Sequence, residues 1–471
     1  MESTTPIKNS SSGLVRQLGL FDSTMVVIGI VIGSGIFMTT GIMAMVLPSV
    51  PLILLAWLLG GLHALAGALT YAELGAAMPQ AGGQYVYLKK AYGPLPAFLF
   101  GWIAFFAYLT GTIAAIAVAF AEYFGHFFPA LSTKHVIFSA SFHLITATVP
   151  ISISSGQCVA VLVIVGLSLV NYLGLFLGKI VQNIFTVAKI GTVILFVIFG
   201  MAASSARPLD FSINPSALGL GQLLSGIGIA LVAVSWTVGG WEYVTFVAGE
   251  IKNPGRNIPR ALILGTVTVT ALYILINVVY LKTLPLSEMA GVVTIAERSA
   301  SVMYGPAGSA LLSAAVIIST FGALNGSILV GPRVYYAMAK DRLFFSSVSK
   351  VHPRYHTPGN AILLQAVWAA VLTLTGTFEQ LFTFVVFVNL MLWIVAAAAV
   401  FTLRKKSPHL PRPYKTWGYP TVPLVFIIAT AGIMLNSLVE KPVESLAGLA
   451  FTAIGIPIYF YWHKKDVREI T

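Results

Sequence analysis

Three stretches of the 471-residue chain place groups that could bind a ligand inside otherwise apolar segments. They are Gly33-Ser34-Gly35, the isolated Lys189, and Trp236-Thr237-Val238-Gly239. Glycine costs about 1 kcal/mol against alanine in a helix, so a helix breaks cheaply at the first and third stretches. A broken helix exposes N–H groups that suit a carboxylate and carbonyls that suit an ammonium or a metal cation. The alternative is that Gly29 and Gly33 form a GxxxG surface for close helix packing.

Lys189 lies about ten residues into an apolar segment, too deep to reach the membrane surface easily. A lysine at that depth costs ~2.5–3.5 kcal/mol on insertion scales, so it needs a local partner or must give up its proton. No acidic residue lies in the same segment. We therefore predict that main-chain carbonyls between Gly29 and Ile32, at the end of a broken first helix, surround the ammonium.

The composition predicts which elements position these groups. The chain is 57% hydrophobic and 9% charged, against about 25% charged in soluble domains, which indicates an all-α polytopic membrane protein. The first 20 residues are polar and do not resemble a cleavable signal sequence. We predict twelve spans, near residues 22–47, 51–78, 95–124, 157–175, 180–202, 222–249, 260–283, 306–339, 358–376, 380–403, 420–438 and 444–463.

The positive charges behind the net charge of +12 are unevenly distributed between the two sides of the predicted membrane, and this distribution indicates the topology. With the N-terminus inside, twenty of the 27 basic residues fall in inner segments and five in outer ones. Arg333 and Lys189 fall within spans. This bias predicts that both terminal tails, 1–21 and 464–471, are cytoplasmic, and it argues against a nucleic-acid partner.

The spans divide into two blocks of five, residues 22–202 and 222–403, followed by a pair at 420–463. An odd number of spans inverts the second block in the membrane, as in secondary transporters. The weak points at Gly33 and Gly239 then fall in the first helix of each block. This correspondence favours binding over packing.

Other polar residues have simpler interpretations. Glu73, near a helix end, is expected to pair with loop cations, and His63 to form a hydrogen bond within the packing. His126, His135 and His143 do not have the spacing of a metal site. The apolar run from His135 to Pro150 is too short to cross the membrane and is expected in the interface or as an early start of the fourth helix.

The eighth span carries Ser319 and Thr320, whose hydroxyls could face the first break and Lys189 or could bond back to their own helix. Cys158 is the only cysteine, which excludes an internal disulfide and a cysteine-based metal site.

Several motifs together resemble the amino acid permeases of the amino acid–polyamine–organocation superfamily, and most nearly the L-type amino acid transporters. The resemblance is carried by Val27-Ile28-Gly29 through Ile36-Phe37, Glu73 to Tyr85, Gly239-Gly240-Trp241, Asn253-Pro254 with Asn257-Ile258-Pro259, and Asn325-Gly326-Ser327. It covers the first ten spans well and the last two only by hydropathy.

The resemblance implies a five-plus-five inverted-repeat fold with discontinuous helices 1 and 6. It implies that the substrate carboxylate meets the backbone of Gly33, Ser34 and Gly35. The amino group would meet carbonyls near Ile30, Val31, Trp236 and Val238.

Trp236 matches an aromatic gate of the relatives. Lys189 matches a lysine that occupies the sodium site of sodium-coupled cousins, with Ser319 and Thr320 nearby. The mammalian relatives pair with a heavy chain through a loop cysteine between helices three and four, which this sequence lacks.

We therefore expect a sodium-independent transporter of L-amino acids, with neutral substrates favoured, in a bacterial inner membrane. The substrate side chain would lie in a pocket that includes Trp236 and Thr237. It would act as an exchanger or with protons, without a cofactor, metal or disulfide-linked heavy chain. A polyamine or cationic amino acid carrier is the alternative, with Glu122 or Glu242 as the acid. A membrane enzyme or a channel would need a nucleophile, metal cluster, charge ring or repeated filter, and none is apparent.

Overall fold

A computed structural model describes residues 14–144, 147–212, 219–375 and 378–470 of the chain. Within these ranges, eleven helical segments are long and apolar enough to cross a membrane. A further apolar helix, Gly359–Thr375, has 17 residues. The protein is therefore an integral membrane protein built almost entirely of helices. The first 13 residues of the expected N-terminal tail and Thr471 lie outside the described residues.

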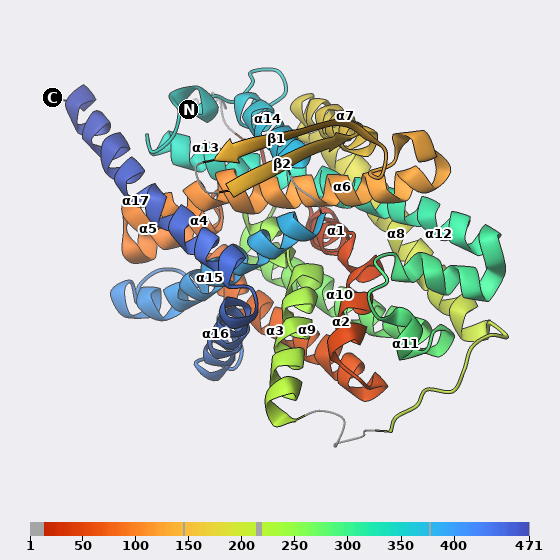
Figure 1. Ribbon diagram of the computed structural model, residues 1–471. Helices are drawn as coiled ribbons and strands as arrows, with labels where there is room; N and C mark the ends of the chain where they lie inside the picture. The colour runs from red at the N-terminus through yellow and green to blue at the C-terminus, as the bar shows by residue number, and fades with distance from the viewer. Residues whose placement is uncertain (1–13, 145–146, 213–218, 376–377, 471) are drawn as a thin grey trace, which may run out of the picture.

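The helices follow one another along the chain, and longer connections separate α6 from α7 and α8 from α9 (Figure 1). They are α1 Leu20–Val31, α2 Thr39–Val46, α3 Val50–Ala77, α4 Gln84–Tyr92, α5 Pro94–Ile103, α6 Leu109–Phe127, α7 Ser155–Tyr172, α8 Leu175–Ala202, α9 Leu220–Val238, α10 Pro254–Thr283, α11 Leu286–Met289, α12 Ile295–Val330, α13 Pro332–Lys340, α14 Gly359–Thr375, α15 Phe378–Lys406, α16 Thr421–Glu440 and α17 Pro442–Ile470. A π-helical turn, Ala104–Tyr108, joins α5 to α6. The last helix thus extends through most of the expected C-terminal tail.

Two of the membrane segments are interrupted. The first stops being α-helical after Val31, passes through a 3-10 turn at Gly35–Phe37, and resumes as α2. The other stops after Val238 and continues as the 3-10 turn Trp241–Thr245. Both interruptions occur at the glycine-containing stretches identified in the sequence. The second needs a glycine, because Gly240 has a φ of 92°.

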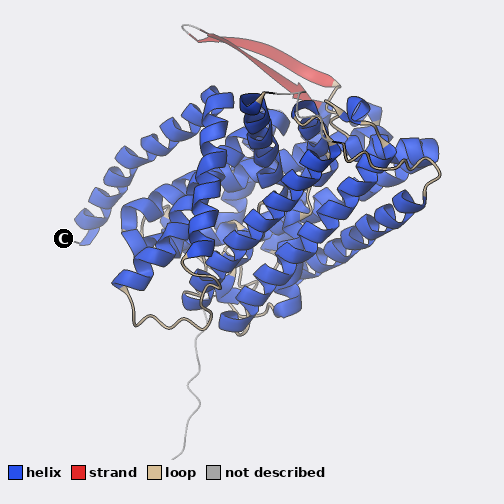
Figure 2. Cartoon of the chain, turned by 90° about the horizontal axis from the view of Figure 1, so that it is seen from below, coloured by secondary structure: helices blue, strands red, loops and turns tan. Residues whose placement is uncertain are grey.

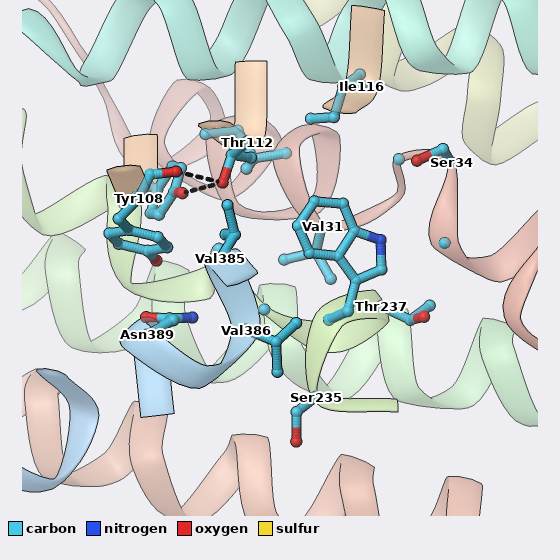
Figure 3. Close-up of a pocket in the computed structure, with 17 residues that line it drawn as sticks. Val31, Ser34, Tyr108, Thr112, Ile116, Ser235, Thr237, Val385, Val386 and Asn389 are labelled. Atoms are coloured by element: carbon cyan, nitrogen blue, oxygen red, sulfur yellow. Dashed lines mark hydrogen bonds between the residues drawn. The ribbon is translucent and has the colours of Figure 1, made fainter. Parts of the chain in front are cut away.

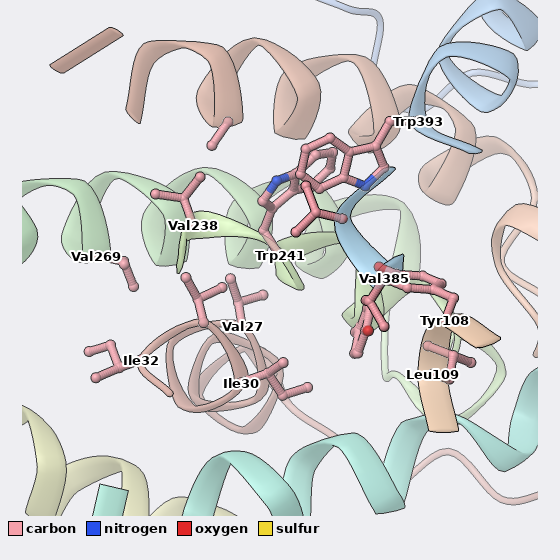
Figure 4. Packing of buried hydrophobic residues seen from close by; sticks show 14 of the residues in the cluster. Val27, Ile30, Ile32, Tyr108, Leu109, Val238, Trp241, Val269, Val385 and Trp393 are labelled. Atoms are coloured by element: carbon pink, nitrogen blue, oxygen red, sulfur yellow. The ribbon is translucent and has the colours of Figure 1, made fainter. Parts of the chain in front are cut away.

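The interrupted helices lie in the middle of the bundle, where other helices cover their exposed backbone. Helix α1 packs against α10, α8 and α12, and α2 packs against α9 (Figure 1). Figure 4 shows Val27, Ile30 and Ile32 of the first segment within the same apolar cluster as Trp241 and Trp393. This burial explains why non-helical backbone is tolerated at membrane depth.

The segment expected in the interface, or as an early start of the fourth helix, forms a β-hairpin. Strand β1, Val136–Leu144, pairs antiparallel with β2, Ala147–Ser154. Figure 2 shows the hairpin outside the helical body. The helical alternative was wrong because it considered only the length of the apolar run. The segment is rich in β-branched and aromatic residues and has Pro150 in it, a composition that favours strand over helix.

Candidate functional site

The two helix interruptions line one cavity of about 40 Å³ (Figure 3). The first contributes five residues and the second contributes five, so the cavity lies where the two breaks meet. These residues are Ile30, Val31, Gly33, Ser34 and Gly35, followed by Ser235, Trp236, Thr237, Gly239 and Gly240. All the predicted contact residues of both breaks are among them except Val238, which is buried but outside the lining.

The remaining wall was not anticipated from the sequence. Tyr243 comes from the 3-10 turn that continues the second interrupted segment. The other wall residues come from the π-helical turn with α6 and from α15, and they are Tyr108, Thr112, Ile116, Val385, Val386 and Asn389. In Figure 3, Tyr108, Thr112 and Asn389 lie at one end of the cavity and Ser34 and Thr237 at the other, with valines between. The signal that could have indicated this wall is Asn389, a lone amide inside a long apolar run.

The first break leaves main-chain donors free. Among the described residues, the N–H groups of Ser34, Gly35 and Ile36 donate to no backbone carbonyl. The side-chain oxygen of Ser34 is buried and also has no partner within the described part of the chain. These groups stand at the start of the second half of the interrupted helix, where the helix dipole favours a negative charge. This end of the cavity can therefore accept a carboxylate.

A carbonyl oxygen is available before the first break. The carbonyl of Ile30 accepts no backbone hydrogen bond in the described ranges. By contrast, the carbonyl of Val31 accepts from the Tyr273 hydroxyl at 2.7 Å, and that of Trp236 accepts from the Gly239 N–H at 3.3 Å. Of the carbonyls predicted to bind an amino group, those of Val31 and Trp236 are therefore already engaged, whereas that of Ile30 is free.

Lys189 lies behind the first break and has no exposed surface. Its Nζ donates to the carbonyl oxygens of Gly29, Ile32 and Ser319, each at 2.7 Å. The first two are within the carbonyl range predicted for it. The ammonium therefore satisfies three acceptors, two of them in the main chain of the first break.

Ser319 and Thr320 point differently although they are adjacent. The Ser319 hydroxyl donates to the Ile32 carbonyl at 3.1 Å, so it belongs to the group around the first break. The Thr320 hydroxyl donates to the carbonyls of Val316 and Ile317 in its own helix. Only Ser319 directly supports the break, and Thr320 takes the back-bonding alternative that the sequence left open.

Comparison with known proteins adds to this geometry. The family model described as amino acid permease matches residues 18–459. The chain belongs to the amino acid permease family. It is 30% identical to the serine/threonine exchanger SteT of Bacillus subtilis, covering 96% of this chain and 98% of the relative.

Mammalian permeases of the family are also similar. The human b(0,+)-type amino acid transporter 1 is 30% identical, with 98% of this chain and 92% of the relative covered. The mouse large neutral amino acids transporter small subunit 2 is 30% identical over 98% of this chain and 85% of its own length. The matches span nearly the whole permease, including both breaks.

Glu242 is the acidic group next to the permease cavity. It is fully buried, and its Oε1 accepts from the Tyr108 hydroxyl at 2.5 Å and from the Trp393 indole at 2.7 Å. Its Oε2 has no partner in the described part of the chain. Tyr108 and Tyr243, which line the cavity, are close to it, whereas Glu242 itself is outside the lining.

The other acidic candidate, Glu122, lies away from the cavity. It accepts from the Thr133 hydroxyl near the hairpin. Nearby, His126 contacts Glu297 at 3.3 Å. Among the described residues, no group of three or more histidine, cysteine, aspartate or glutamate residues could hold a metal ion.

Three further ionisable residues inside the helices have structural partners. Glu73 binds Arg404 through two hydrogen bonds of 2.9 and 2.6 Å and lies 3.3 Å from Arg412, as expected for pairing with loop cations. His63 is hydrogen-bonded to Thr430 at 2.7 Å, as expected.

Arg333, the second cation within a span, forms a buried ion pair with Glu250. The main-chain carbonyl of Glu250 accepts from the N–H groups of Gln17 and Leu18. These hydrogen bonds hold the segment before α1 against Glu250. Arg333 and Glu250 lie outside the cavity lining.

Proposed function

We propose that the permease is a secondary transporter that moves neutral L-amino acids by alternating access and without sodium. The observation that carries this proposal is the meeting of two helix breaks at one cavity. The first break supplies free N–H donors and the free carbonyl of Ile30, and the second supplies further residues of the cavity lining. The carboxylate and the ammonium of an amino acid lie a few atoms apart, so its binding site needs a donor and an acceptor close together. Main-chain groups can bind both charges whatever the side chain of the amino acid is.

The substrate carboxylate would lie against the N–H groups of Ser34, Gly35 and Ile36, with the Ser34 hydroxyl as a fourth donor. The amino group would meet the free carbonyl of Ile30. The side chain would then extend past Trp236 toward Tyr108, Thr112 and Asn389. Their polar groups at the far end of the cavity would favour a side chain that forms a hydrogen bond.

The size of the cavity also bears on the substrate. A water molecule needs about 10–15 Å³ of such volume, so the cavity of about 40 Å³ accommodates roughly three water molecules. Binding would therefore require the walls to move, and small side chains would require the least movement. The serine/threonine exchanger among the relatives is in line with this preference.

Lys189 would act as a fixed internal cation. Its ammonium donates to the carbonyls of Gly29, Ile32 and Ser319, which are buried next to the break. A bound sodium ion would have to compete with this charge. We propose that transport proceeds by exchange of amino acids or with protons for this reason.

The membrane arrangement follows the same proposal. We propose twelve spans, with α14 as the ninth, in two inverted blocks of five, 22–202 and 222–403, and two helices within 420–463. Both termini would face the cytoplasm because twenty of the basic residues fall on that side. A bacterial inner membrane would be the location.

Uptake into proteoliposomes tests the transport class. Labelled serine, threonine, alanine and leucine would be offered in sodium and in choline buffer, with and without amino acid inside, and with and without a pH gradient. We expect equal uptake in both buffers and stimulation by internal amino acid or by the gradient. Uptake that requires sodium would contradict the role assigned to Lys189.

A pair of serine variants tests the carboxylate position. Ser34 and Ser168 are both buried, and neither hydroxyl has a partner within the described residues, but only Ser34 lines the cavity. A hydrogen bond to a charged group is worth about 1.5–3 kcal/mol, so Ser34→Ala should weaken amino acid binding about 10- to 100-fold. Ser168→Ala should leave binding unchanged. Equal affinity in the two variants would place the carboxylate elsewhere.

Glu242 favours a second candidate function, the transport of cationic amino acids. Its Oε2 lacks a partner in the described ranges and lies behind the cavity wall formed by Tyr108. If that wall opened, the carboxylate could receive a side-chain ammonium. Uptake of lysine that is lost in Glu242→Gln, with serine uptake retained, would support this candidate.

A further inference from the structure

A basic groove lies where the start of α10 meets the loop between α15 and α16. It has a volume of about 540 Å³ and is lined on one side by Arg256 and Arg260 and on the other by Pro413 and Tyr414. The two sides approach closely, since a Cβ added at Gly255 would lie 3.0 Å from Pro413. The groove is separate from the cavity between the helix breaks and takes no part in the proposed transport step.

The positive charge of this groove is not neutralised by the protein. Arg256 and Arg260 are exposed, and among the described residues neither forms an ion pair. Lys252 and Lys415 are exposed beside them. Glu73 of α3, which contacts this loop, is already engaged by Arg404, by Arg412 and by the main-chain N–H of residue 416. Glu250, which precedes α10, is paired with Arg333. The groove therefore presents several cations without a counter-charge.

The position of the groove along the membrane normal matches the layer of lipid headgroups. Helix α10 has 30 residues, which at 1.5 Å each is about 45 Å, whereas the hydrocarbon core is about 30 Å thick. Part of the helix must therefore stand outside the hydrocarbon, and the charges of Arg256 and Arg260 make its first turns the part that does so. Arg256 and Arg260 are four residues apart and so share a helix face. Trp417, 73% exposed in the adjoining loop, is the kind of residue that lies at this membrane interface.

We infer that this groove binds the phosphate headgroup of an anionic phospholipid from the adjoining leaflet. The arginines donate to the phosphate oxygens, and the acyl chains run down the apolar face of α10. A bound headgroup bridges the start of α10 and the loop 407–420, so it stabilises the contact between them. A phosphate free in solution offers the same oxygens but has no acyl chain to hold it at this depth.

The test is thermal unfolding of the purified full-length chain in detergent. It is titrated with phosphatidylglycerol, with phosphatidylcholine of the same acyl chains, and with inorganic phosphate. We expect phosphatidylglycerol to raise the unfolding temperature at concentrations where phosphatidylcholine does not. Inorganic phosphate should have no comparable effect, and added salt should weaken the response. Equal stabilisation by the two lipids, or by phosphate alone, would overturn the inference.

A pair of double variants locates the site. Arg256→Gln with Arg260→Gln should weaken the apparent affinity for phosphatidylglycerol about 30-fold, at ~1 kcal/mol for each charge near an anionic surface. Lys350→Gln with Arg354→Gln removes the same charge from exposed positions outside the groove and should change the affinity less than threefold, given the short range of such contacts. An equal loss in both would mean that only net charge matters. If the Arg256/Arg260 double variant does not fold, native mass spectrometry of the wild-type protein is the test. The inference requires that the protein retains phosphatidylglycerol in preference to phosphatidylcholine, and equal retention of the two lipids would overturn it.

Discussion

The two helix breaks meet at one cavity, but opposite kinds of side chain hold them. Behind the first break, Lys189 donates to carbonyl oxygens of the interrupted backbone. Beside the second, Glu242 accepts from Tyr108 and Trp393, which belong to other membrane segments. The first break is thus held by a side chain, that of Lys189, which donates directly to its main-chain carbonyls. The second is fixed through a side chain that it carries itself.

This difference determines how each break should respond to mutation. Loss of the lysine would remove a donor from three buried carbonyls at once, of which that of Ile32 keeps the Ser319 hydroxyl. Loss of the glutamate would leave two side-chain donors without an acceptor. Unpaired main-chain groups at membrane depth are costly and cannot rotate away. Side chains such as Tyr108 can adjust. We therefore expect the first break to be the more sensitive of the two.

The largest effect is expected for Lys189→Met, which keeps a chain of similar length and removes the donor. Three carbonyls would each lose the hydrogen bond from Nζ, and Ile32 would keep only the one from Ser319. At a cost of ~1 kcal/mol for each lost bond, the competent arrangement of the break would be populated about 100-fold less. Uptake per folded molecule in proteoliposomes, with protein content measured by size-exclusion chromatography, should fall by that factor.

The matched control is Lys179→Met on the same helix. Lys179 pairs with Asp22 at 3.5 Å, and its side chain is 19% exposed, so water can replace the lost contact. A surface pair of this kind contributes at most about 1 kcal/mol, and uptake should change less than about fivefold. A similar loss of uptake in the two variants would show that transport depends on lysines of this helix in general. The proposal that Lys189 holds the first break would then be withdrawn.

A smaller effect is expected at the second break. Glu242→Ala leaves the Tyr108 hydroxyl and the Trp393 indole without their acceptor, at a cost of ~1–3 kcal/mol, and should lower serine uptake about 30-fold. Glu242→Gln keeps an oxygen for both donors and should lose less than about threefold. If Glu242→Gln were as damaging as the alanine variant, the negative charge would be required and the comparison with Lys189 would need revision.

The sequence predicts one side of this comparison better than the other. Glycines and a deep lysine are local signals, so the breaks and the contacts of Lys189 with Gly29 and Ile32 could be predicted from the residues alone. The groups that hold the second break come from distant segments. Only tertiary packing brings Tyr108 and Trp393 to Glu242.

The same reason explains the other misses. The wall formed by Thr112, Val385 and Asn389 depends on how two helices cross, which no short motif encodes. Thr320 could not be separated from Ser319, because helix rotation by one residue decides which hydroxyl faces Ile32. The hairpin after α6 was missed because the length of an apolar run was weighed above its strand-like composition.

The last prediction concerns the point where the two breaks touch. A Cβ at Gly35 would lie 2.6 Å from the Thr237 hydroxyl and 3.0 Å from its Cα, so the breaks would have to separate. A Cβ at Gly33 would find its nearest neighbour at 3.6 Å, an ordinary contact. Overpacking costs about 1–3 kcal/mol, so Gly35→Ala should weaken serine binding about tenfold, measured by thermal stabilisation with serine. Gly33→Ala should change it less than threefold. The reverse order would mean that backbone freedom at Gly33, and not the close approach at Gly35, sets the geometry of the site.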